Sequence, residues 1–166
     1  MSYHIYTTRG LVLSTRGVGE VDRVYSILTR DLGLIRARAT GVRKVNSKLR
    51  GTLEPFSLSS ISLVRGKDYW RLTSSELVKK VGESKALARP LALLEKLVQG
   101  EAPNPELFDA VEGFMIQDLG LKNNFEVNLV AQILYHLGYL KKSDLDLPER
   151  RLISRINEGL KASNLV

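Results

Sequence analysis

Short apolar and alternating segments, separated by glycines and other turn residues, fill the first half of the chain. Leu34–Thr40 alternates most clearly, with Ile35, Ala37 and Ala39 on one side and polar residues between them. A period of two is typical of a half-buried β-strand. Similar patterns predict five strands, over Ile5–Ser14, Val24–Thr29, Leu34–Thr40, Phe56–Val64 and Tyr69–Thr73. Tight turns join most of these strands, which favours a small closed barrel over a flat sheet.

Apolar residues at helical spacing replace this pattern in the second half of the chain. Thr73–Glu76 has capping-box spacing and predicts the start of a helix, which Pro90 should break near Arg89. Three further helices are predicted, from Asn104-Pro105 to Gly120, from Phe125 to Leu137 with Gly138 as terminator, and from Pro148 to about Lys161.

The change from strand to helix patterns predicts an α+β protein with two parts. We expect a five-stranded barrel domain at residues 1–79 and a small all-α domain at residues 80–166. Charge divides at nearly the same place: residues 1–80 hold 15 Lys and Arg against 6 Asp and Glu, whereas residues 81–166 hold 10 against 12. Only the first part, with a balance of +9, is suited to binding a polyanion.

A stretch without acidic residues, from Leu32 to Leu53, carries most of the candidate binding residues. These are Arg36, Arg38, Arg43, Lys44, Lys48 and Arg50. The first two lie on the outer side of the predicted third strand, and the others lie in a connection bounded by Gly41 and Gly51. Any one of these cations alone is explained by a solvated surface. Six of them along one strand and loop, without a compensating acid, favour contact with a phosphate backbone.

The fifth predicted strand adds Trp70 and Arg71 as candidates. Neighbouring strand residues point to opposite faces, so only one of Tyr69 and Trp70 can be exposed. An exposed ring on a barrel can stack on a base, whereas a buried ring belongs to the core, and the sequence leaves both alternatives open. Asp22 and Arg23, by contrast, predict a turn with a surface ion pair.

Residue types that several other functions require are missing. The chain has no cysteine, which excludes disulfides and thiolate zinc sites, and its two histidines, His4 and His136, lie far apart. No apolar run approaches the roughly 20 residues of a membrane span, and the N-terminus lacks a signal-peptide pattern. We therefore expect a cytoplasmic binding protein without cofactor, metal, membrane contact or catalytic activity.

Eight short segments in the first half follow the order and spacing of a known family across residues 10–80. They are Leu11–Arg16, Gly19–Arg23, Leu28–Gly33, Gly41–Lys44, Ser47–Gly51, Leu53–Phe56, Leu72-Thr73 and Ser75–Leu77. Together they resemble the N-terminal domain of RecO, the bacterial recombination mediator of the RecF pathway. The second half resembles the helical domain of that family more loosely, chiefly from Phe125 to Leu140.

The resemblance implies an OB-fold barrel followed by a helical domain. It also implies a nucleoid-associated role in DNA repair: binding single- and double-stranded DNA, annealing complementary strands and helping to load recombinase. The implied protein partners are RecR and the acidic, apolar-ended tail of the single-stranded DNA-binding protein. The second half offers basic and apolar residues that could dock such a tail: Lys141, Lys142, Arg150, Arg151 and Arg155, with Leu137, Tyr139 and Leu140. Acids at Asp144, Asp146 and Glu149 interrupt the basic group, which favours the alternative of a solvated helix end.

The sequence departs from the RecO pattern in its second half. RecO proteins are commonly longer, and many carry a four-cysteine zinc module between helices of the second domain. Here there is no cysteine, and only the short link Lys141–Leu147 separates two predicted helices. We therefore expect a shortened family member without the zinc module. Whether its helical domain still binds the acidic tail is left open by the sequence.

Two other functions fit the same residues. An OB-fold module that binds RNA or ribosomes would use a similar basic surface, because contacts to the phosphate backbone do not by themselves separate RNA from DNA. An adaptor whose barrel binds a partner protein is the second alternative.

Overall fold

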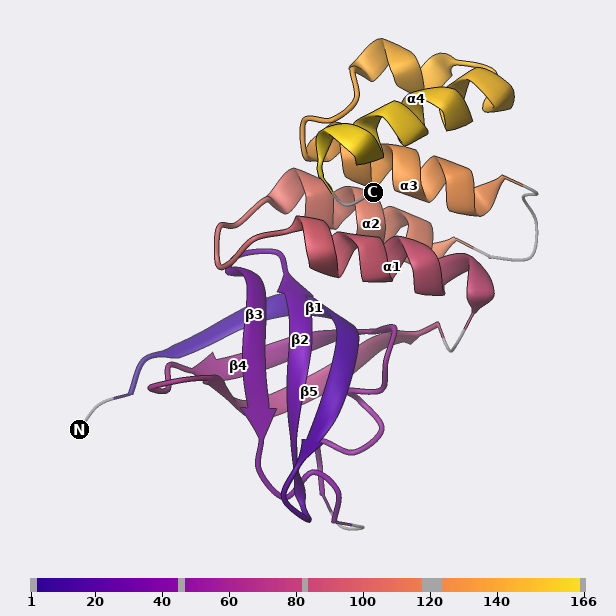
Figure 1. Cartoon of the computed structure of the whole chain (residues 1–166). Coiled ribbons are helices and arrows are strands. Elements are labelled where there is room, and N and C mark those ends of the chain that lie inside the picture. The colour runs from indigo at the N-terminus through magenta and orange to yellow at the C-terminus, as the bar shows by residue number, and fades with distance from the viewer. Residues whose placement is uncertain (1–2, 45–46, 82–83, 118–123, 165–166) are drawn as a thin grey trace. The chain divides into compact units, whose positions relative to one another are not determined.

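The computed structural model describes residues 3–44, 47–81, 84–117 and 124–164. The chain divides into two compact units. The first comprises Met1–Ser84 and Gln99–Pro105, and the second comprises Lys85–Val98 and Glu106–Val166. Figure 1 shows the strands of the first unit in indigo to magenta and the helices of the second in rose through orange to yellow. The domain boundary expected between residues 79 and 80 stays a prediction.

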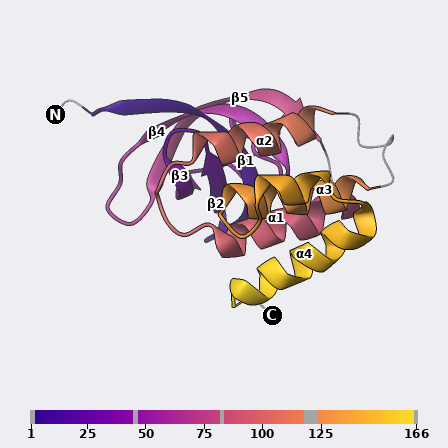
Figure 2. The same ribbon diagram turned by 90° about the horizontal axis from the view of Figure 1, so that it is seen from above.

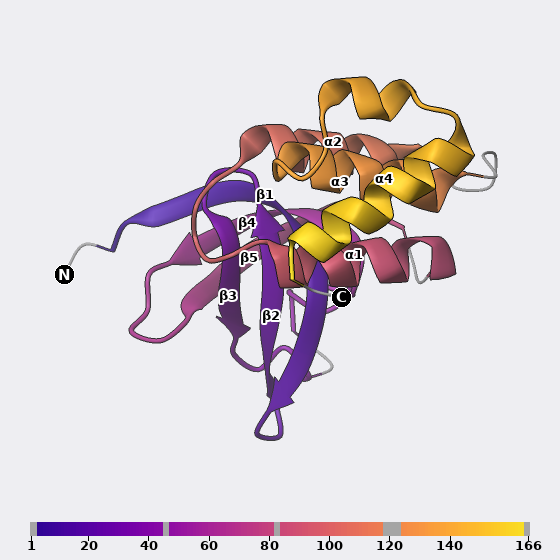
Figure 3. The ribbon, with the colours of Figure 1, turned by 45° about the horizontal axis from the view of Figure 1, so that its top comes forward.

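The first unit contains a closed β-barrel. Among the described residues its strands are β1 (Ile5–Val18), β2 (Asp22–Thr29), β3 (Gly33–Ala39), β4 (Ser57–Val64) and β5 (Trp70–Lys80), ordered β1-β2-β3-β5-β4. Figure 3 shows β1, β2 and β3 side by side, as their antiparallel pairing requires. A short parallel ladder between β3 and β5 closes the barrel. The predicted five-stranded OB-fold barrel is confirmed.

Alternate strand residues point inward and fill the barrel with an apolar core. Gly10 lies where β1 pairs with both β2 and β4. A Cβ at Gly10 would lie 2.6 Å from Cγ2 of Ile27 and 3.1 Å from Cδ1 of Ile61, so only glycine fits there. The register of β1 against β2 then shifts between Val12 and Ser14, as in a β-bulge, which helps the strand to bend around the barrel.

Strand β5 extends well beyond its predicted end. The capping-box segment Thr73–Glu76 continues the strand, with Ser75 opposite Ile61 and Glu76 opposite Ser60 on β4. The predicted helix start at this segment is therefore wrong. Pairing with β4 satisfies the backbone groups that a helix would otherwise satisfy, and tertiary pairing outweighs a local capping pattern.

The second unit is helical. Its described elements are α1 (Lys85–Leu97), α2 (Pro105–Ile116), α3 (Phe125–His136), the 3₁₀ helix η1 (Lys142–Asp146) and α4 (Glu149–Ala162). Helix α3 contacts α1, η1 and α4, and Figure 2 shows the four helices from above. Ala131 and Leu134 of α3 pack in a second apolar core with Leu152 and Ile156 of α4. The predicted α+β class is confirmed.

Most helix ends in the described structure agree with those predicted from the sequence. Helix α1 runs through Pro90 without the predicted break, and Pro90 is buried together with Leu87, Leu91 and Leu94. The predicted helix end at Gly120 lies outside the described residues. Gly138 follows α3 with a φ of 87°, as expected for a helix terminator. No helix in the described part of the chain combines the length and apolarity of a membrane span.

Candidate functional site

Strand β3 presents the alternation that the sequence predicts. Ile35, Ala37 and Ala39 are at most 1% exposed and hold the strand against the barrel core. Arg36 is exposed between them and Arg38 is half-buried. The arginines therefore lie on the outer surface of the barrel, while the residues between them fix the position of the strand.

Asp22 compensates the charge of one candidate residue. Its Oδ2 accepts hydrogen bonds from Nε and Nη2 of Arg38 at 3.1 and 2.6 Å, and its Oδ1 accepts one from the Gly41 N–H at 2.7 Å. The Gly41 bond and then the Arg38 guanidinium hold the pKa of Asp22 below its ordinary value. The predicted surface pair of Asp22 with Arg23 is wrong: Asp22 is buried and pairs with Arg38.

Residues 40–56, between β3 and β4, form the basic loop. Its first part folds back onto the turn between β1 and β2, where the Arg43 N–H donates to the Val21 carbonyl at 2.9 Å. Nη1 of Arg43 donates to the Gly19 carbonyl at 3.2 Å. Both Arg43 and Lys44 remain exposed. The loop is thus tied to the barrel at the point where it carries two adjacent cations.

The later part of the basic loop is a series of turns anchored in the core. Leu49 is 9% exposed and Leu53 is 2% exposed, and both belong to the barrel core. The Thr52 hydroxyl donates to the Leu49 carbonyl at 2.9 Å. Lys48 and Arg50, which flank Leu49, point to solvent. Buried leucines therefore alternate with exposed cations here, as they do along β3.

A pocket of about 310 Å³ lies between β2 and the basic loop. Charged and polar residues lining it are Arg23, Tyr25, Arg43, Arg50 and Glu54. Burial raises the pKa of the Tyr25 hydroxyl, while the charge of Arg23 and its hydrogen bond to that hydroxyl oppose the shift. Arg43 and Arg50 were predicted from the sequence. Arg23 was missed, because strand pairing, which the local pattern does not specify, brings it beside the loop.

Trp70 and Arg71 occupy different environments. Trp70 is 5% exposed, its Nε1 donates to Oε1 of Glu101 at 3.0 Å, and Cζ of Arg65 lies 4.7 Å from its ring centroid. With the ring enclosed in this way, no open face of Trp70 is available to stack on a base. Arg71 is exposed and lies in register with Arg38 across the β3–β5 ladder, so it extends the row of cations.

We define the basic surface by the outward cations of β3, β5 and the basic loop. Its members are Arg36, Arg38, Arg43, Lys44, Lys48, Arg50 and Arg71. The strand ladder brings Arg38 and Arg71 together, and the pocket brings Arg43 and Arg50 together. Lys48 is exposed in the basic loop and does not line the described pocket. Asp22 and Glu54 are the carboxylates that the described structure places against this surface.

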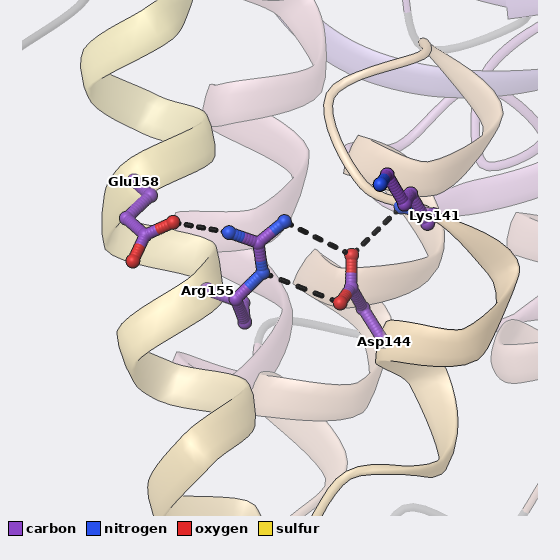
Figure 4. Close-up of polar contacts among 4 residues, drawn as sticks. All are labelled: Lys141, Asp144, Arg155 and Glu158. Atoms are coloured by element: carbon purple, nitrogen blue, oxygen red, sulfur yellow. Dashed lines mark hydrogen bonds and ion pairs between the residues drawn. The ribbon is translucent and has the colours of Figure 1, made fainter.

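The basic group near the C-terminus is partly compensated within the second unit. Asp144 accepts hydrogen bonds from the Lys141 backbone N–H at 2.8 Å and from Nε of Arg155 at 3.2 Å, and Arg155 also pairs with Glu158 (Figure 4). The Lys141 bond and the Arg155 guanidinium lower the pKa of Asp144, and Asp144 raises the pKa of Arg155. Arg155 therefore has internal partners, whereas Lys142, Arg150 and Arg151 are exposed.

The first unit is a closed barrel of OB topology with cations along β3, β5 and the β3–β4 loop. OB-folds include domains that bind oligonucleotides and domains that bind oligosaccharides. Residues 1–81 match the family model described as recombination protein O N terminal. The barrel is therefore a RecO N-terminal domain. No group of three or more His, Cys, Asp or Glu side chains suited to a metal ion occurs among the described residues.

Relatives extend the similarity into the second unit. A DNA repair protein RecO of Dehalococcoides mccartyi is 45% identical over 75 residues, which cover 45% of this chain and 30% of the relative. A DNA repair protein RecO from another strain of that species is 34% identical over 146 residues, which cover 80% of this chain and 57% of the relative. A DNA repair protein RecO of Nostoc is 30% identical over 145 residues, which cover 80% of this chain and 48% of the relative. The matched regions thus span 30 to 57% of these relatives.

Proposed function

We propose that the barrel binds single- and double-stranded DNA through the basic surface, as part of a role in DNA repair and recombination. The observation that carries the proposal is the position of the cations. The cations of the basic loop lie in a segment that is hydrogen-bonded to and packed against the barrel. The cations of β3 alternate with buried apolar residues that fix the strand, so both groups form one fixed surface. The name shared by the relatives, DNA repair protein, supports DNA as the polyanion.

Binding would be driven mainly by charge. Each Lys or Arg that neutralises a phosphate releases condensed counterions, so affinity should fall steeply as salt rises. A surface that neutralises two strands at once lowers their mutual repulsion, which is the physical basis of strand annealing. The proposal includes this annealing and help in loading recombinase together with RecR. It also includes docking of the acidic tail of single-stranded DNA-binding protein, and action in the cytoplasm. No step of it needs a catalytic group.

Charge reversal in the basic loop tests the proposal. The double variant Arg43→Glu with Lys44→Glu should weaken binding to a single-stranded oligonucleotide at least about tenfold at ~100 mM salt, because contacts to phosphates become repulsive. The slope of log affinity against log salt should also become shallower, by about 0.7 for each lost contact to a single strand. Fluorescence anisotropy measures both quantities.

The matched control makes the same charge change on the helical unit. Lys96→Glu with Lys161→Glu alters two exposed lysines of α1 and α4 and should leave affinity within about twofold, since these residues lie outside the basic surface. Equal losses in the two double variants would show that net charge alone governs binding, and would overturn the proposed interface.

The same variants separate the proposal from its rivals. Annealing of complementary strands, with and without single-stranded DNA-binding protein, should slow in the loop variant and not in the control. Competition with RNA of matched sequence tests the RNA-binding alternative, which predicts that RNA displaces DNA. An adaptor would keep affinity for its partner in the loop variant, and its DNA binding at physiological salt would be feeble.

A further inference from the structure

The pocket between β2 and the basic loop differs from the open part of the basic surface. Arg23 lies directly opposite Gly17 in the β1–β2 ladder. Nη1 of Arg43 is 3.3 Å from the position that a Cβ on Gly17 would occupy. The missing side chain at Gly17 therefore leaves room for the Arg43 guanidinium next to Arg23. Two arginines from different segments meet at one end of the pocket.

The other side of the pocket comes from the end of the basic loop. Arg50 and Glu54 line it, with Gly51 between them at a φ of 88°. This φ belongs to the left-handed region, which glycine adopts without strain and which turns the chain sharply after Arg50. Tyr25 forms part of the lining from β2. Leu49 and Leu53 anchor the loop in the barrel core, so the cations are held in place.

Charge and size indicate which ligand fits. Among the described lining residues there are three arginines and one carboxylate, which leaves a charge of +2. An internal phosphodiester carries a charge of −1, whereas a phosphate monoester carries about −1.5 to −2 near neutral pH. Arginine donates two parallel hydrogen bonds to phosphate oxygens, so a monoester with three terminal oxygens suits several guanidinium groups. The volume of about 310 Å³ leaves room for the adjoining sugar.

We propose that this pocket binds a phosphate monoester at the end of a DNA strand, held by Arg23, Arg43 and Arg50. The inference rests on the proposed DNA binding and deepens it: the basic surface follows the strand, and the pocket recognises its phosphorylated terminus. The net charge of +2 attracts a monoester with a charge of about −2 more strongly than a singly charged internal diester, so the pocket discriminates between the end of a strand and its interior.

Oligonucleotides that differ only at their ends test the inference on the full chain. Three internally labelled strands of one sequence carry a 5′-phosphate, a 3′-phosphate or hydroxyls at both ends. We expect one phosphorylated strand to bind about five- to tenfold more tightly than the hydroxyl strand, because charge-assisted hydrogen bonds form only with the added group. Deoxyadenosine monophosphate is the fourth probe, since a free nucleotide carries the same monoester.

Matched variants assign the effect to the pocket. Arg23→Ala and Arg50→Ala should each remove the preference for the phosphorylated strand, while Arg23→Lys should keep part of it. Lys48→Ala removes one cation of the same loop outside the described pocket lining, and should weaken all three strands alike. Circular dichroism checks that each variant folds. Because two alanine variants are used, the test still stands if one of them does not fold.

The outcomes separate this inference from the proposed function. Equal binding of phosphorylated and hydroxyl strands overturns the end-binding pocket and leaves DNA binding intact. Failure of every strand to bind overturns both. Deoxyadenosine monophosphate binding as tightly as the phosphorylated strand supports the monoester chemistry but overturns the strand end as its source. A preference that survives Arg23→Ala and Arg50→Ala places the recognition elsewhere and also overturns the inference.

Discussion

At the scale of single residues, the carboxylate of Asp22 organises one end of the basic surface. It holds the side chain of Arg38 and the backbone of Gly41 together, and so joins β3 to the start of the basic loop. The same contact neutralises Arg38, whereas the other cations of the basic surface have more freedom to contact phosphate. A stretch that is free of acid in the sequence is therefore not free of acid in space.

Asp22→Asn tests this role through pH. The folded-state pKa of Asp22 is depressed, so its charge stabilises the fold above the ordinary pKa of 3.8, and this stabilisation is lost as pH falls through the lower folded value. The variant should be less stable than the native protein at pH 7, and the difference should shrink by about pH 2. Urea unfolding followed by Trp70 fluorescence measures both.

Asp68→Asn is the control for this prediction. It removes an exposed carboxylate from the turn between β4 and β5 and should leave the midpoint nearly unchanged at both pH values. A gap between Asp22→Asn and the native protein that stays constant from neutral to acid pH would contradict the assigned role.

At the scale of elements, the sequence predicts what depends on local periodicity. Strand β3 and its outward arginines follow from a period of two, and α4 follows from apolar residues at helical spacing. The continuation of β5 through Thr73–Glu76 does not follow, because it depends on pairing with β4. The pocket was missed for the same reason: Arg23 reaches Arg43 only through the β1–β2 ladder and the folded-back loop.

Gly10→Ala tests how tightly the elements of the barrel pack. The added Cβ would lie 2.6 Å from Cγ2 of Ile27 and 3.1 Å from Cδ1 of Ile61, and Ile27 is fully buried, so a core side chain must shift. We expect a loss of about 1–3 kcal/mol in the free energy of unfolding, as for other overpacked cores. Urea denaturation followed by the fluorescence of Trp70, the single tryptophan, reports on the barrel.

The same substitution at Gly113 is the control. Gly113 lies in α2, where an added Cβ meets nothing within 4 Å. Gly113→Ala should be neutral or stabilising by up to about 1 kcal/mol, because alanine favours a helix interior. If Gly10→Ala, like Gly113→Ala, caused no loss in the free energy of unfolding, close packing at Gly10 would not be a constraint.

At the scale of the whole molecule, the barrel unit is not continuous in sequence. Residues 99–105, which separate α1 from α2 in the chain, belong to the first unit. The Leu34 N–H donates to the Gly100 carbonyl at 3.2 Å, and a Cβ on Gly33 would lie 2.8 Å from the backbone of Ala102. The segment that follows α1 therefore completes the barrel, and a cut after residue 84 would remove these contacts.

Glu101→Ala in the full chain measures what this segment contributes. Glu101 accepts the Trp70 Nε1–H at 3.0 Å and pairs with Arg65 at 2.6 Å, while Arg65 lies over the Trp70 ring. Removing the carboxylate leaves a buried indole N–H without this partner and frees Arg65, so the barrel should lose about 1–2 kcal/mol of stability. Trp70 emission should shift to the red in the folded state as water reaches the ring. Glu101→Gln can still accept the indole hydrogen bond and should keep most of the native emission while losing the ion pair.

Glu106→Ala, in the first turn of α2, provides a control outside this unit. Identical emission and urea midpoints for Glu101→Ala and the native protein would mean that the barrel is complete without residues 99–105, and would favour a boundary near residue 79.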